Sequence, residues 1–404
     1  MALHYTPSTP TISDLTLHLT IPDLPRQEET HLRSTFFPAE WHPQSGVQLT
    51  WPHANTDWAD LLPEVDNCFV HIAFEILNHD ERLLIVTPEP DRIQTLLAER
   101  LPARLLPAVC YFECPTNDTW ARDHAFLTLI SPDGPLLLDF QFNGWGKKFP
   151  ADLDNQICRR MANEINEVNG ADGANGANGS SLLRGIYEPH LDFVFEGGSI
   201  ESDGCGTLMT TSECLLSPHR NPGLTREQIE QRLLHYFHAE RVLWLDHGYL
   251  AGDDTDSHID TLARFCPGGT IAYIQCTDPA DEHYESLRAM EEQLRTFCVL
   301  GASPDEDASY QPIPLPLPSP IFDPDDGHRL PATYANFLIL NSAVLLPTYG
   351  QPANDDLARS QLQRAFPRHE IVPVDCRVLI RQHGSLHCST MQFPVGVMEV
   401  KKAK

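Results

Sequence analysis

Four short polar segments interrupt apolar stretches of this sequence, at places where packing alone would not put polar side chains. The first, residues 117–123, comes directly after an expected strand at 109–113 and contains Asp118, Trp120 and Asp123. A carboxylate accepts two parallel N–H bonds from a planar guanidinium, and an indole face attracts the cation. Taken alone, the segment favours a turn bearing an ordinary surface Arg–Asp pair, with a guanidinium site as the alternative.

The second segment is a glutamate followed by two glycines. Glu196, Gly197 and Gly198 end an apolar strand expected at 191–195. Glycine allows the backbone to approach a ligand closely, which indicates a binding site beside Glu196. A tight turn with an exposed glutamate would give the same pattern.

The third segment, residues 252–260, is rich in aspartate and contains His258 and Asp260. On an extended chain these two side chains face the same side, because they are two residues apart. A histidine and a carboxylate in one pocket suit proton transfer beside a bound cation. A metal loop and a solvated acidic turn would also explain the segment, although the spacing does not match the twelve-residue calcium loop.

The fourth segment, residues 382–390, places Cys388 after a glycine-containing turn near the end of the chain. A cysteine there could act as a nucleophile, whereas inert burial is the common fate of this residue type. His387 is its neighbour in sequence and therefore need not face it.

Composition narrows the class of protein. The 404 residues have a formal net charge of -28, which disfavours nucleic acid and anionic membranes and would attract a small cation. Solubility alone is another reason for an acidic surface. No apolar run approaches the roughly 18 residues of a membrane span, and residues 1–30 lack the pattern of a signal peptide.

The cysteines point to a reducing compartment. There are eleven, an odd number without C-x-x-C spacing, and together with 19 histidines they fit no zinc pattern. We therefore expect reduced thiols, a cytoplasmic location and no metal.

Helices and strands alternate along the chain, which predicts an α/β fold with one domain over residues 35–395. We expect an N-terminal extension at 1–34, a Gly- and Asn-rich insertion at 169–181, a long loop at 302–327 and a tail at 396–404. The apolar periodicity predicts helices at 64–79, 91–99, 151–168, 224–239 and 355–366, with strands between them.

Taken together, the polar segments resemble the agmatine deiminase and bacterial-type peptidylarginine deiminase family, over roughly residues 35–395. The resemblance is carried by Pro38–Trp41, Thr50–Pro52, Asn117–Asp123, Phe140–Gly146, Glu196–Glu201, Leu215–Pro222, Asp253–Asp260, Tyr334–Phe337 and His387–Cys388. It implies a five-bladed, pseudo-symmetric α/β propeller of pentein type, with ββαβ modules around a central pocket.

The resemblance also implies roles for single residues. Cys388 matches the nucleophile and His258 the general acid/base, while Asp123 and Asp260 match the carboxylates that hold the guanidinium. The substrate pocket is expected to include further side chains, namely Glu196, an aromatic wall at Trp120, and Asp118 and Asp254.

The function implied is hydrolysis of agmatine to N-carbamoylputrescine and ammonia, through a covalent thiouronium on the cysteine and without a metal or cofactor. Three positions depart from the family pattern, where glycine is usual: Ala125, Ser257 and the stretch 383–385. Such changes bear on pocket shape, so another guanidine (peptidyl-arginine or free arginine) stays open as the substrate. An inactive polyamine-binding protein and a metal-binding protein also stay open, as does assembly into a homo-oligomer.

Overall fold

The strands of this protein form five small mixed sheets in an α/β fold. The computed structural model describes residues 34–170, 182–301 and 309–398. No named strand of one sheet pairs with a strand of another sheet within these ranges. The predicted α/β class is confirmed, although a closed sheet is not found among the described strands.

Four of the sheets share one plan, in which an antiparallel pair is followed by a helix and a strand parallel to the second member of the pair. The first unit contains β4 (Leu127–Leu129), β5 (Leu136–Gln141), α6 (Ile157–Gly170) and β6 (Ile186–Val194). The second contains β7 (Glu201–Ser202), β8 (Thr207–Thr211), α8 (Arg226–Tyr236) and β9 (Arg241–Leu245). The third contains β10 (Ala263–Cys266), β11 (Thr270–Gln275), α9 (Tyr284–Leu294) and β12 (Gln311–Pro316). The fourth contains β13 (Leu338–Ile339), β14 (Ala343–Thr348), α10 (Pro352–Ala365) and β15 (Glu370–Asp375).

The fifth sheet joins the two ends of the described chain. Its strands are β16 (Thr390–Pro394), β1 (Gln44–Thr50), β2 (Arg82–Thr87) and β3 (Val109–Glu113), with helices α2 (Leu62–Asn78) and α3 (Pro90–Arg100) between the last three. β16 pairs antiparallel with β1, and β2 and β3 follow in parallel. The last strand thus completes the same plan for the first.

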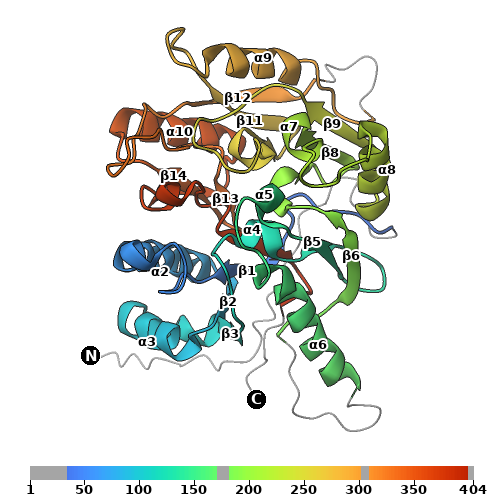
Figure 1. Ribbon diagram of the computed structural model, residues 1–404, viewed down its shortest axis with the longest axis vertical. Helices are drawn as coiled ribbons and strands as arrows, with labels where there is room; N and C mark the ends of the chain where they lie inside the picture. The colour runs from blue at the N-terminus through green and yellow to red at the C-terminus, as the bar shows by residue number, and fades with distance from the viewer. Residues whose placement is uncertain (1–33, 171–181, 302–308, 399–404) are drawn as a thin grey trace, which may run out of the picture.

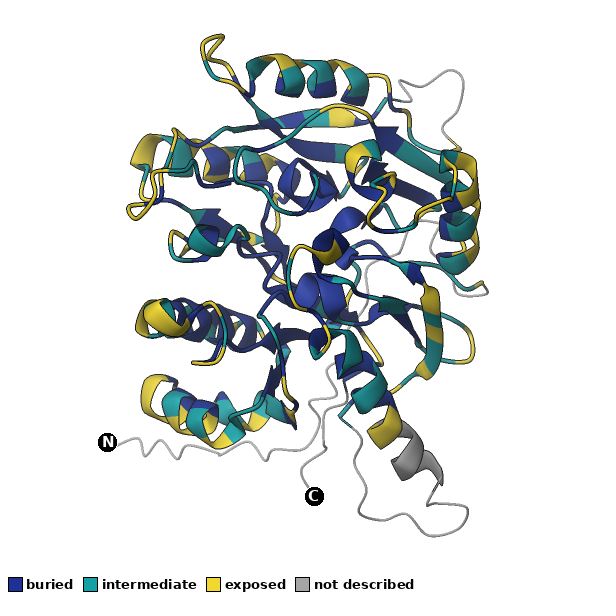
Figure 2. Cartoon of the chain, viewed as in Figure 1, coloured by how far each residue is buried: buried dark blue, intermediate teal, exposed yellow. Residues whose placement is uncertain are grey.

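Short helical segments lie near the middle of the view in Figure 1, with the five sheets around them. They include α4 (Ala121–His124), α5 (Gly144–Lys147), α7 (Ser212–Leu215), η4 (Gly197–Ser199) and η5 (Ile259–Thr261), while η1 (Ala59–Leu61), η2 (Leu106–Ala108), η3 (Asp154–Gln156) and η6 (Leu379–Gln382) serve as connections. Figure 2 shows that burial is greatest in this central region, whereas the outer helices expose one face. Polar residues from separate sheets are therefore brought together inside the molecule.

The apolar stripe predicted for the first long helix is confirmed. α2 buries Val65, Phe69, Ile72 and Ile76 completely, at a spacing of three or four residues. Burying each such side chain contributes about 1.5–3 kcal/mol. This stripe fixes α2 against its sheet.

The prediction of an unbroken loop over 302–327 is wrong in part, because Gln311–Pro316 forms β12. Pro312, Pro314 and Pro316 lack the N–H that a central strand needs, and their frequency disguised the strand. β12 lies at the edge of its sheet, where prolines can face away from the partner strand. The alternate residues Ile313 and Leu315 are buried.

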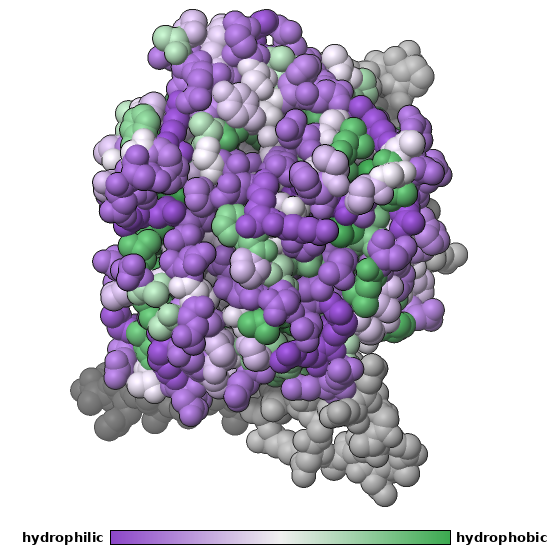
Figure 3. All heavy atoms as spheres, in the orientation of Figure 1, coloured by the Kyte–Doolittle hydropathy of each residue, from purple (hydrophilic) through white to green (hydrophobic). Residues whose placement is uncertain are grey.

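Several expectations fall largely outside the described residues, namely the extension at 1–34, most of the insertion at 169–181 and most of the tail at 396–404. Among the helices that the structure describes, none combines the length and apolar character needed to span a bilayer. Hydrophilic residues cover most of the face shown in Figure 3, with small hydrophobic areas between them.

Candidate functional site

Gly198 in η4 lies where three of the predicted site residues converge. A Cβ atom added to Gly198 would lie 2.7 Å from Nδ1 of His258, 2.8 Å from Oδ1 of Asp123 and 3.2 Å from Oδ2 of Asp260. The Gly198 N–H also donates a hydrogen bond of 2.9 Å to Asp123 Oδ1. The glycine therefore lets Asp123 of α4 meet His258 and Asp260 from the turn at η5.

Cys388 joins this group from the segment between η6 and β16. Its Sγ lies 3.7 Å from Oδ2 of Asp260 and accepts a hydrogen bond of 3.2 Å from Nδ2 of Asn336. Burial, with the negative charges of Asp260 and Asp123, raises the pKa of the Cys388 thiol well above its usual value. The Cys388 thiol is therefore protonated in the resting protein.

His258 is fully buried and lies between two carboxylates. Its Nδ1 is 3.7 Å from Asp123 Oδ1, and its Nε2 is 3.6 Å from Glu196 Oε2. Burial alone would lower the pKa of His258, but the charge of Asp123 and the interaction with Glu196 raise it well above the ordinary value. His258 is therefore an imidazolium at neutral pH, as a proton donor must be.

The local backbone at this histidine differs from the extended chain that the sequence suggested. Asp260 lies in the 3₁₀ turn η5, so the expectation that a two-residue spacing alone aligns the pair is wrong. Ser257 has a left-handed φ of 62° and places His258 at the start of the turn. Both Oδ atoms of Asp253 fasten this loop by accepting hydrogen bonds from residues 255 and 257.

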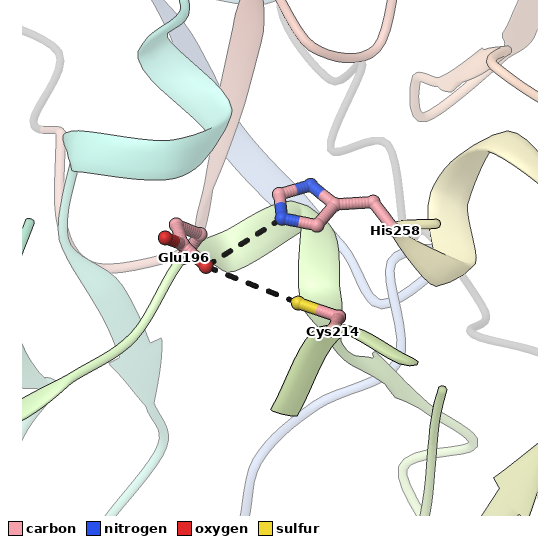
Figure 4. Close-up of side chains that lie close together, drawn as sticks. All are labelled: Glu196, Cys214 and His258. Atoms are coloured by element: carbon pink, nitrogen blue, oxygen red, sulfur yellow. Dashed lines mark hydrogen bonds and ion pairs between the residues drawn. The ribbon is translucent and has the colours of Figure 1, made fainter. Parts of the chain in front are cut away.

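Glu196 lies behind His258 and not on the cavity wall, which corrects the expectation that it lines the pocket. It is completely buried, and its Oε2 accepts a hydrogen bond of 2.7 Å from Nε of Arg220. Figure 4 shows Glu196 pointing toward both His258 and Cys214, whose Sγ is 4.0 Å from Oε2. Glu196 therefore acts on the site through His258.

Among the residues that the structure describes, two groups of acidic, histidine and cysteine side chains are compact enough to share a metal ion: Glu196 with Cys214 and His258, and Glu40 with Glu201 and His387. In both groups arginine cations already pair with the carboxylates: Arg220 in the first, and Arg122 and Arg264 in the second. A further cation would be repelled at these positions. The donor sets fit buried ion pairs better than a metal centre.

A cavity opens above Cys388 and Asp123. It encloses about 430 Å³, open solvent at its mouth included, and it is lined by Asp57, Asp118, Trp120, Asp123, Trp145, Phe149, Asp254, Thr255, Gln382, His383, Gly384 and Cys388. Of the expected pocket residues, Trp120, Asp118 and Asp254 are on this wall. The lining holds four aspartates and no lysine or arginine, which suits a cationic ligand.

Asp118 and Asp254 have different surroundings on the wall. Asp118 Oδ1 accepts a hydrogen bond of 3.1 Å from the indole N–H of Trp58, and burial raises the Asp118 pKa to about 6. The side chain of Asp254 is 36% exposed and lies near the mouth, 3.5 Å from Nδ1 of His383. Asp254 is the more accessible partner for a second charge on a ligand.

A known family matches almost the whole of the described chain. The family model of the Porphyromonas-type peptidyl-arginine deiminase covers residues 36–394. The chain belongs to this deiminase family.

Relatives of the family carry two kinds of name. A Vibrio parahaemolyticus protein named "Putative agmatine deiminase" is 33% identical over 89% of this chain and 96% of its own. The structure of the C. jejuni agmatine deiminase with substrate bound is 33% identical, with a TM-score of 0.77 over 90% of this chain and 97% of that one. A Porphyromonas gingivalis structure named "Putative Arginine Deiminase" is 47% identical, with a TM-score of 0.79 over 90% and 100% of the two chains.

The structure also brings to the site two residues to which the sequence assigned no separate role, Trp145 and Asn336. Trp145 donates its indole N–H to Asp123 Oδ2 at 2.9 Å, from a left-handed turn between Gly144 and Gly146. Asn336 contacts Cys388, and also Asp260 Oδ2 at 3.2 Å. Both residues lie in motifs that carry the family resemblance, which was the only signal available for them.

A buried charge cluster lies on the far side of Asp260. His387 Nδ1 is 2.8 Å from Asp260 Oδ2, and its Nε2 is 2.7 Å from Glu40 Oε1. Glu40 in turn pairs with Arg122 at 3.0 Å and with Arg264. The sequence showed His387 only as a neighbour of Cys388, because Glu40 is far away along the chain.

Proposed function

We propose that this protein is a deiminase that hydrolyses agmatine to N-carbamoylputrescine and ammonia, with Cys388 as its nucleophile. The observation that supports this most is the convergence of Cys388, His258, Asp123 and Asp260, of which Cys388 and Asp123 line an acidic, aromatic cavity. The reaction class is hydrolysis of the C–N bond of a linear amidine.

Substrate binding would use carboxylates that can still accept hydrogen bonds. Asp260 Oδ1 is buried without a hydrogen-bond partner among the described groups, and Asp123 faces the cavity. A guanidinium placed between them would gain charge-assisted hydrogen bonds that fix its plane. The indole of Trp120 would form the wall beside it.

The chemical steps divide between Cys388 and His258. The Cys388 thiolate attacks the guanidinium carbon, and His258 gives its proton to the departing nitrogen, so that ammonia leaves and a thiouronium remains. His258, now neutral, takes a proton from water as the water attacks the same carbon. The C–S bond then breaks with its electron pair left on sulfur, the remaining hydroxyl proton passes to solvent, and the ureido product and the thiolate are released. Neither step calls for a metal or organic cofactor.

The charge of the cavity supports agmatine over free arginine. Agmatine carries a terminal ammonium, for which Asp254 and Asp57 near the mouth are suitable partners. The α-carboxylate of free arginine would face these aspartates with no lysine or arginine on the lining to offset them. Peptidyl-arginine is the second candidate, supported by the name of the family.

The proposal extends to the arrangement of the five units and to the cellular location of the protein. We infer that the five ββαβ units form the blades of a propeller around the cavity and that residues 35–395 act as one catalytic domain, in line with the family match over 36–394. None of the eleven cysteines forms a disulfide, which supports a cytoplasmic location. A place in putrescine synthesis and arginine catabolism follows if agmatine is the substrate.

The test is an assay of purified protein with agmatine, free arginine and an arginine-containing peptide, measuring ammonia and ureido product. We expect product from agmatine, and a loss of about 10⁴-fold or more in kcat for Cys388→Ala. Circular dichroism and a melting curve establish that the variant is folded.

Each remaining outcome has a defined meaning. Product from arginine or the peptide alone, lost in Cys388→Ala, would keep the chemistry and replace the substrate. Full activity in Cys388→Ala would refute the nucleophile. Guanidine binding without any product would favour an inactive polyamine-binding protein.

A further inference from the structure

His387 bridges two carboxylates inside the protein and is only 1% exposed. Its two ring nitrogens lie 2.8 Å from Asp260 Oδ2 and 2.7 Å from Glu40 Oε1. A neutral imidazole has one N–H and can donate to one of these oxygens, whereas an imidazolium donates to both. Both carboxylate oxygens therefore receive a hydrogen bond from His387 only when the ring carries a second proton.

The charges around Glu40 decide which nitrogen is free. Arg122 and Arg264 both donate to this carboxylate. Burial would raise the pKa of Glu40, but the charges of Arg264 and Arg122, together with the hydrogen bond from His387, outweigh it and hold the pKa far below its usual range. Glu40 thus stays ionised and takes the Nε2–H of His387, which leaves the electron pair of Nδ1 facing Asp260.

The two histidines of the site are in opposite states. Burial and the nearby Arg122 and Arg264 lower the pKa of His387, so that it is neutral in the resting protein. His258 has a raised pKa and already holds its proton. Of these two histidines, only His387 can accept a proton.

Cys388 is a source of such a proton within reach of Asp260. Its Sγ lies 3.7 Å from Asp260 Oδ2, the same oxygen that His387 Nδ1 contacts. Asn336 Nδ2 is within 3.2 Å of both Sγ and Oδ2, so it can stabilise a negative charge on the sulfur. The thiol and the imidazole therefore both contact one oxygen of Asp260.

We propose that His387 accepts the thiol proton of Cys388 through Asp260. The S–H bond breaks with its electron pair left on sulfur, and the proton passes by way of Asp260 Oδ2 to Nδ1 of His387. A neutral thiol and a neutral imidazole become a thiolate and an imidazolium, which lies between Asp260 and Glu40. The inference rests on the proposed role of Cys388 as nucleophile.

The test follows alkylation of Cys388 by iodoacetamide as a function of pH, with peptide mass spectrometry reporting each cysteine. Alkylation requires the thiolate and no substrate, so its outcome is independent of whether agmatine is hydrolysed. In His387→Asn we expect the rate at Cys388 to fall about tenfold or more near pH 7, the effect of raising the thiol pKa by one unit. The deficit should shrink as pH rises, because hydroxide then removes the proton directly.

Two further variants guard against a folding defect in His387→Asn. Glu40→Gln removes the charge that stabilises the imidazolium and should slow alkylation by about three- to tenfold. Asp260→Asn should also slow alkylation if the carboxylate relays the proton. If Asp260 were only a nearby negative charge, its removal would lower the thiol pKa and speed alkylation. The exposed Cys298 is the internal reference, with an unchanged rate in every variant.

Faster alkylation in Asp260→Asn would overturn the relay. If His387→Asn slowed alkylation of Cys388 by the same factor at every pH, His387 would have only a structural role. If the alkylation rate did not change, His387 would have no role in deprotonating the thiol. Slower alkylation in folded variants of both residues, recovering at high pH, is the expected result.

Discussion

The two sides of the candidate site use the same residue types and reach opposite protonation states. On one side His258 lies against Asp123 and Glu196, and its pKa is raised. On the other side His387 lies against Asp260 and Glu40, and its pKa is lowered. Both rings are buried, so burial itself does not separate them.

The difference arises from the cations behind the carboxylates. One arginine, Arg220, supports Glu196 and divides its charge with Asp256. Two arginines, Arg122 and Arg264, lie near His387 on the other side. A histidine between two carboxylates is thus made a proton donor or a proton acceptor by charges one layer further out.

Removing those arginines should have the largest effect on stability. Arg220→Gln and Arg264→Gln each strand buried carboxylates, so we expect the free energy of unfolding to fall by about 3–5 kcal/mol. The loss should be greater for Arg264, which pairs with both Glu40 and Glu201, than for Arg220, whose second partner Asp256 is 25% exposed. Chemical denaturation near neutral pH measures both.

Arg232→Gln is the matched control, because Arg232 pairs with Asp192 on the surface, with side chains 34% and 71% exposed. We expect its effect to stay within about 1 kcal/mol. If Arg264→Gln cost no more than this surface substitution, the buried cluster would not hold its carboxylates as charges.

The pH dependence of stability should separate the histidines by sign. The pKa of His258 is raised above the ordinary 6.5, so its stabilisation is present below that pH and is lost as pH rises through the folded value. The pKa of His387 is lowered, so the folded protein loses stability as pH falls below 6.5, where the unfolded chain takes up the proton first.

The measurement is the free energy of unfolding against pH for wild type, His258→Asn and His387→Asn. The difference curves should slope in opposite directions, by up to about 1.4 kcal/mol per pH unit. Slopes of the same sign would mean that the two sides do not differ in protonation, and the division of roles between them would fail.

A smaller effect on activity is expected from removing the indole N–H of Trp145 that donates to Asp123. Trp145→Phe removes the N–H that donates to Asp123 Oδ2 at 2.9 Å. We expect kcat/KM for agmatine to fall about five- to tenfold, equivalent to about 1–1.5 kcal/mol for one lost hydrogen bond. Steady-state kinetics check it.

Trp51→Phe is the control for this change. It removes an equivalent N–H, 2.7 Å from Asp66 Oδ1, at a residue outside the cavity lining. An equal loss of kcat/KM in both variants would indicate a general packing effect instead of a role for the indole at Asp123.

Helices and strands could be predicted from the sequence where they depend on local patterns of residues. The stripe of α2 and the strand at 241–245 could be predicted because each depends on residues a few positions apart. The strand at 311–316 was missed, because its alternating prolines are tolerated only at a sheet edge, and edge position is a property of the assembled sheet.

The candidate nucleophile and its partners show the same limit. Cys388, His258, Asp123 and Asp260 could be named from motifs and their resemblance to a family, since residue type and order are written in the chain. Glu196 was expected on the pocket wall, but it lies behind His258 and is paired with Arg220. Its position depends on where α7 and the loop at 217–222 pack.

By itself, the sequence determined the alternation of helices and strands, the acidic charge and the residues able to act on a guanidine. Only the tertiary structure decided which of them meet, which carboxylates have a cation behind them and which histidine is protonated. The reason is physical: pKa values and hydrogen bonds depend on distances of a few ångströms in a buried medium. The chain brings Glu40 to His387, 347 positions away, only by folding.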